Sequence, residues 1–140
     1  MTGPRSWLHT AVHDHLTATL TVPVYDQQPA TAPPDSRPEY VVLHPWAGQT
    51  GRGYLHTAAT DLLWPVTIVI AGMTRRAVLH HLDAVAAALD GWCPHPTDPT
   101  YPAFRQHTEG GEVLAEGITG WRPYSTSVTY AIDTHPQEHP

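Results

Sequence analysis

Eleven histidines are the residues of this 140-residue chain best suited to chemistry. His9 and His13 are four positions apart, a spacing that places two imidazoles on one helix face, where they can share a metal ion. His15 is a third candidate ligand. The sequence lacks the glutamate that adjoins such a pair in metalloproteases, and no cysteine or carboxylate follows at a ligand spacing. We therefore interpret these histidines as a solvated helix face, with a small His-rich metal-dependent enzyme as the alternative.

His80 and His81 form a second histidine pair, followed by Asp83. Adjacent residues on a helix project about 100° apart, so the two rings are poorly placed to bind one metal ion. We expect two surface histidines. The alternative is that one of them lies at an interface and titrates near neutral pH.

Other catalytic patterns find no support. The sequence contains no Gly-x-Ser-x-Gly motif, and Cys93, which precedes a proline, is expected to be a buried spectator thiol. The glycine-rich segment 48–53 lacks the Lys-Ser/Thr pair of a phosphate-binding loop. Glu109 and Glu112 are expected to be solvated. The sequence thus predicts a non-catalytic protein with no cofactor and no metal.

Composition narrows the class further. Seven basic residues, all arginine, stand against thirteen acidic residues and give a net charge of −6. A protein that wraps DNA needs several cationic phosphate contacts, so this chain is a poor candidate for that role. One cysteine excludes an internal disulfide and favours an intracellular setting. The absence of a signal-like apolar start, or of an apolar run of about 18 residues, leads us to expect a cytosolic location.

Apolar periodicity predicts two helices. Leu8, Val12 and Leu16 form one stripe over residues 6–20, with Ser6 as the expected N-cap. The second helix covers residues 74–90, where Thr74 is the expected N-cap and Gly91 occupies the usual position of a helix-ending glycine. Its stripe contains the following residues: Val78, Leu82, Val85 and Leu89.

Alternating residues predict several strands. The clearest covers 62–71, which is apolar on both faces and so belongs near the centre of a covered sheet. Others are expected at 39–44, at 125–134, at the short segment 22–26 and near 113–118. Fifteen prolines mark the connections. The expected connections are a loop at 27–38, a long loop at 45–60 and an irregular link at 92–102.

Together these elements predict a single α+β domain over residues 1–140. Its expected architecture is a mainly antiparallel sheet of about four to five strands covered by two helices, with the long loop after the second strand. Residues 135–140 are expected to fray.

Aromatic residues in loops and at element ends point towards an interaction protein. Exposed aromatic side chains are common anchors of protein interfaces, although a small domain also uses them to close the ends of its core. Together with two polar residues of the long loop, they give the predicted interface: Trp46, Arg52, Tyr54, His56, Trp92 and Trp121.

The order of these elements resembles that of the tail terminator, or tail completion, proteins of long-tailed bacteriophages. The similarity begins with an N-terminal helix, the segment Val22-Pro-Val-Tyr-Asp26, a Pro-rich turn and Tyr40-Val-Val-Leu43. It continues through a glycine-containing loop, the strand Val66-Thr-Ile-Val-Ile-Ala-Gly72 and the helix 76–89. A final strand after Arg122-Pro123 completes it. The resemblance covers nearly the whole chain but includes no single diagnostic motif.

The resemblance implies a virion structural protein, assembled in the host cytoplasm, that forms a homo-oligomeric ring, commonly a hexamer. Such a ring caps the head-proximal end of the tail tube, stops tube polymerisation and joins the tail to the head connector. Its expected partners are the tail-tube protein and the head–tail connector protein, and DNA is expected to pass through it without specific binding. A head–tail connector, or neck adaptor, is the alternative among virion proteins.

Overall fold

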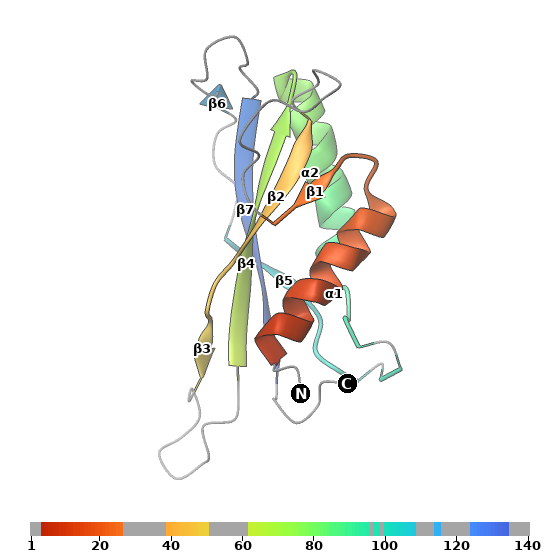
Figure 1. Cartoon of the computed structure of the whole chain (residues 1–140), viewed down its shortest axis with the longest axis vertical. Helices are drawn as coiled ribbons and strands as arrows, with labels where there is room; N and C mark the ends of the chain where they lie inside the picture. Colours follow the sequence, from red (N-terminus) through yellow and green to blue (C-terminus); the bar gives the residue numbers. More distant parts are fainter. Residues whose placement is uncertain are drawn as a thin grey trace.

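The computed structural model describes residues 4–26, 39–50, 62–95, 97–98, 100–108, 114–115 and 124–134. Two helices lie on the same side of a twisted sheet, which gives the predicted α+β architecture (Figure 1). The main path of the sheet runs β1-β2-β4-β7-β5, while β3 pairs with β4 and β6 pairs with β7. The elements are α1 (Pro4–Thr19), β1 (Val24–Tyr25), β2 (Tyr40–Pro45), β3 (Gln49–Thr50), β4 (Leu62–Gly72), α2 (Arg75–Leu89), β5 (Arg105–Thr108), β6 (Leu114–Ala115) and β7 (Tyr124–Thr134).

Strand β4 is the central strand, as its two apolar faces predict. It pairs antiparallel with β7 over its full length, from Leu62↔Thr134 to Gly72↔Tyr124, and with β2 on its other side. The short β1 joins β2 in parallel and makes the sheet mixed. The even-numbered apolar residues of β4, which point towards the helices, are all buried: Leu62, Trp64, Val66, Ile68 and Ile70.

Helix α1 covers this core with the predicted stripe. Leu8, Val12 and Leu16 are fully buried, and burial of each such side chain contributes about 1.5–3 kcal/mol. The prediction of Ser6 as N-cap is wrong, because the helix already begins at Pro4. A proline is well suited to the first helical turn, where its missing N–H is not needed and its φ is already helical.

Helix α2 agrees with its prediction at both ends. The hydroxyl of Thr74 accepts a hydrogen bond from the backbone N–H of Ala77, at 3.0 Å, and so caps the first turn. Gly91 adopts a φ of 80° just beyond the last turn, a conformation that glycine adopts without strain. Val78, Val85 and Leu89 are buried against the sheet.

The prediction of one irregular loop at 45–60 is only partly right, because β3 lies inside it. Pro45 pairs with Val66 and Gln49 with Leu63, so four steps along the first strand match three along β4. Strands β2 and β3 are therefore one edge strand interrupted by a bulge at 46–48. Residues 51–61 lie outside the described part of the chain.

Pro65 lies in the central strand, where a missing N–H would normally break the ladder. Its carbonyl accepts a hydrogen bond from the backbone N–H of Trp46, at 3.1 Å, so this peptide edge faces the bulge. The nitrogen of a strand residue points to the same side as its carbonyl, so the missing donor coincides with the gap between β2 and β3. The bulge and the proline accommodate each other.

The second face of the sheet carries a smaller core. Tyr40, Val42 and Ala71 are buried there, and Tyr25 and Val69 pack against them. Val41 and Leu43, which alternate with them along β2, belong to the main core on the opposite face.

The C-terminal half of the chain supplies β5, β6 and β7, and β5 ends the main path of the sheet. Strand β6 falls within the predicted 113–118 segment and pairs with the start of β7. Strand β7 covers the predicted 125–134 segment, and Thr129 and Ala131 on its outward face are buried. Residues 27–38 and 135–140, predicted as a loop and a frayed tail, lie outside the described residues.

Two glycines with positive φ provide a matched test of the bulge. A Cβ at Gly48 would lie 2.5 Å from the backbone oxygen of Leu63, whereas one at Gly91 would meet only the flexible guanidinium of Arg105 at 3.1 Å. We expect Gly91→Ala to lower the free energy of unfolding by about 1–2 kcal/mol, the cost of a left-handed residue. Gly48→Ala should cost clearly more, because the backbone must also move. Urea unfolding followed by circular dichroism measures both; equal losses would contradict the proposed role of the bulge.

Candidate assembly surface

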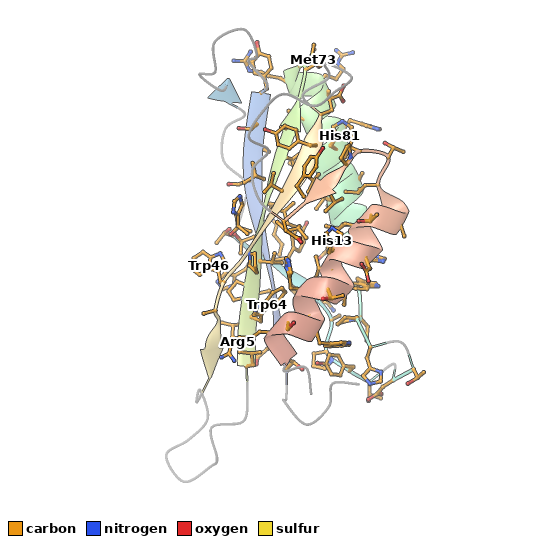
Figure 2. The ribbon with its side chains drawn as sticks, in the orientation of Figure 1. Arg5, His13, Trp46, Trp64, Met73 and His81 are labelled. Carbon is orange, nitrogen blue, oxygen red and sulfur yellow. The ribbon has the colours of Figure 1, made fainter. Side chains whose placement is uncertain are left out.

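Trp46 is the most exposed large apolar residue of the described chain, with 57% of its surface accessible. The bulge places it on the sheet face that the helices do not cover, and Figure 2 shows it on the far side of the sheet from α1. Its indole N–H donates a hydrogen bond to the hydroxyl of Thr67, at 2.8 Å. That hydroxyl lies 2.9 Å from the hydroxyl of Thr129 on β7. The tryptophan is thus held in one orientation with its ring open to solvent.

A shallow hollow of about 420 Å³ adjoins Trp46. Its lining comes from the bulge, from β4 and from β5, three segments that only the sheet brings together: Trp46, Ala47, Gly48, Leu63, Pro65 and His107. Arg5 of α1 reaches the same bulge and donates from its Nε to the carbonyl of Ala47, at 2.5 Å. The result is a largely apolar depression beside a fixed aromatic ring, an arrangement typical of the centre of a protein interface.

Trp92, another predicted interface residue, has a place within the fold. Its ring stacks on Phe104 with centroids 5.9 Å apart and on His15 with centroids 4.0 Å apart. It is half-buried against the main core. This packing accounts for the tryptophan without a partner protein.

The remaining predicted interface residues are Arg52, Tyr54, His56 and Trp121. All four lie outside the described residues and stay predictions.

The histidines of α1 do not share a single role. His9 Nε2 lies 3.0 Å from a carboxylate oxygen of Asp26, and His13 Nδ1 lies 3.5 Å from one of Asp14. The interpretation of His15 as part of a solvated face is wrong, because its Nε2 lies 2.9 Å from the carbonyl of Ala88. It joins α1 to the last turn of α2, where carbonyls lack helical partners.

The prediction for His81 is also wrong. This side chain is buried rather than at the surface, and its Nε2 lies 2.7 Å from a carboxylate oxygen of Glu39. The pair ties α2 to the residue that precedes β2. His80 is exposed, as predicted.

The described residues offer few chemical groupings. Among them, no set of three histidine, cysteine or acidic side chains is placed to hold a metal ion. Cys93 is partly exposed rather than buried, and its thiol lies 3.4 Å from the carbonyl of Tyr101. No helix in the described ranges is long and apolar enough to cross a membrane.

Among the described residues, two groups have a pKa shifted from its ordinary value. Burial, followed by the negative charge of Asp90, raises the pKa of the Tyr130 phenol above its ordinary value. Hydrogen bonds from the hydroxyl and the backbone N–H of Thr100 lower the pKa of the Asp98 carboxyl. Neither group belongs to the hollow.

Sequence reasoning missed the exposed end of α2. Met73 and Leu79 are each 50% exposed, and Figure 2 places Met73 at the end of the molecule remote from Trp46. The helical periodicity of the sequence could have indicated that Leu79 is exposed, because Leu79 falls outside the stripe formed by Val78, Leu82 and Val85.

Comparison with solved structures finds the same fold in a virion. The chain is similar to one in the structure of the virion of a native gene transfer agent particle, with a TM-score of 0.64 and 17% sequence identity. The similarity covers 91% of this chain and 94% of that chain. No protein-family model matches the chain, and no curated protein matches its sequence.

Two tryptophans on neighbouring positions of the sheet test the distinction between surface and core. Trp64→Ala should lower the free energy of unfolding by about 3–5 kcal/mol, because it empties a buried site. Trp46→Ala should cost about 1 kcal/mol or less, since it removes one hydrogen bond and little buried surface. Chemical denaturation of both variants checks this. A loss at Trp46 as large as that at Trp64 would mean that Trp46 holds the fold together.

The buried phenol of Tyr130 predicts a loss of stability at alkaline pH. The unfolded chain releases a tyrosine proton near pH 10, whereas the folded chain holds this one to higher pH. The contribution of the Tyr130 phenol to the free energy of unfolding is therefore complete below about pH 10. It declines as pH rises through the folded-state pKa. Tyr130→Phe should make the alkaline decline less steep. Unfolding free energies measured from pH 8 to 11 test this, and identical slopes for the two proteins would contradict it.

Proposed function

We propose that this protein is a virion structural protein, and specifically a tail terminator that forms a ring on the head-proximal end of a tail tube. The observation that carries the proposal is the likeness, along nearly the whole of both chains, to a chain of a gene transfer agent virion, a phage-like particle. In the proposed role, the ring stops tube polymerisation and joins the tail to the head connector.

The exposed sheet face supports a role in assembly. Trp46 and the adjoining hollow offer a rigid aromatic ring beside a depression, and neither is needed to close the main core. Rigid aromatic groups lose little conformational entropy on binding, which is why they dominate interface energies. We assign this face to contact with another virion protein, with the tail-tube protein as the first candidate.

The charge of the chain is compatible with a channel for DNA. The sequence has a net charge of −6 and no lysine. Phosphate contacts supply most non-specific affinity for DNA, and an acidic ring provides few of them. DNA would therefore pass through without being retained.

Removal of the protein from its own particle is the direct test. Without a terminator, tube polymerisation has no stop, so we expect tails of uncontrolled length that lack heads. Tails of normal length that remain unattached would instead indicate a neck adaptor. Normal, joined particles would contradict both roles. Electron microscopy of the particles measures tail length and attachment together.

Complementation by variants makes the test specific to the surface. Wild-type protein should restore tails of normal length, whereas Trp46→Ala should restore them poorly although it folds. Asp14→Ala is the matched control, because Asp14 is a highly exposed residue of α1 on the opposite side of the sheet.

A further inference from the structure

The outward face of α2 carries its charges in an unusual order. Exposed residues recur every three or four positions along the side of the helix that points away from the buried Val78 and Val85. The first half of this face is basic and apolar, with Arg75, Arg76, Leu79 and His80. The second half is acidic, with Asp83, Ala87 and Asp90.

This order opposes the helix dipole at both ends. Anions are favoured near a helix N-terminus and cations near its C-terminus. Helix α2 has two arginines and no acidic residue in its first turn, no basic residue in its last turn, and Asp90 as its C-cap. The isolated subunit therefore gains no stability from this distribution of charges.

Most of these charges also lack an ion-pair partner among the described residues. Arg76 and Asp83 are seven residues apart, beyond the three- or four-residue spacing at which helix side chains meet. Within the part of the chain that the structure describes, the ion pairs all join a histidine to a carboxylate, and none includes Arg76, Asp83 or Asp90. Arg75 lies over the ring of Tyr124, 4.8 Å from its centroid, and so has a role of its own.

We propose that the two halves of this face bind each other between copies of the chain. The basic half of α2 in one subunit contacts the acidic half of α2 in the next, with Leu79 and Met73 supplying the apolar part of the contact. The occupant is a second copy because one helix carries both complementary charges, and Arg76, Asp83 and Asp90 form no ion pair among the described residues. Exposed apolar groups on either side of the two arginines favour a protein partner over nucleic acid, whose backbone offers only phosphate and sugar.

Two copies of α2 packed antiparallel would satisfy this contact as a closed pair, whereas copies offset head to tail would extend it into a ring. The closed ring rests on the proposed function, whereas the contact itself does not.

Charge reversal tests the contact without risk to the fold. Arg76→Glu and Asp90→Arg each bring the helix into agreement with its dipole, so each should keep or raise the melting temperature. Each should nevertheless weaken self-association about tenfold or more, because like charges then meet across the interface. Combining both reversals in one chain should restore association. Asp14→Arg, a charge reversal on the other helix, is the control and should leave association unchanged.

Light scattering and sedimentation, with and without tail-tube protein, measure the outcome. If neither Arg76→Glu nor Asp90→Arg changes self-association, the proposed contact is overturned and the terminator role is unaffected. Association that depends on the two charges but never engages tail-tube protein would support the contact and contradict the terminator role. A wild-type protein that remains monomeric in every condition would contradict both.

Discussion

The pairing of β4 with β7 is the constraint on which the rest of the molecule depends. These two strands are hydrogen-bonded along their whole length, and their helix-facing side chains are the largest single contribution to the main core. Both helices pack their apolar stripes against that core, and every remaining strand joins the sheet through β4, β7 or β2. Because a shift of one residue would exchange the two faces, the register of this pair also decides which residues reach the outer surface.

The outer surface arises where the regular pairing is interrupted. A central strand that contained no proline could continue its ladder with β2 past Pro45. Pro65 removes one donor there, and Gly48 allows the chain to pass close to the oxygen of Leu63. The resulting bulge turns Trp46 outward and opens the hollow beside it. The departure from regular sheet geometry and the candidate assembly surface therefore have one physical cause.

The sequence was sufficient to predict features that depend on neighbouring residues. The stripe of α2, its cap at Thr74 and the alternation of β4 follow from spacing and local hydrogen bonds, and the structure has all three. Features that depend on distant segments were missed. Nothing near His15 or His81 indicates that one reaches Ala88 and the other Glu39. Trp46 was predicted as an interface residue from its place in a loop, but the hollow beside it requires the strand register.

If α2 forms the proposed contact, the order of its charges sets stability and assembly against each other on one helix. Reversing these charges would favour the isolated subunit, because the dipole would then be matched at both ends. A subunit that must associate with copies of itself benefits instead from carrying both halves of a complementary surface, unsatisfied until the partner arrives. Trp46 follows the same logic on the other face of the sheet, since its indole is fixed internally while its ring stays open. On both faces the core is closed and the candidate binding residues are exposed, so the two proposed contacts can form without opening the core.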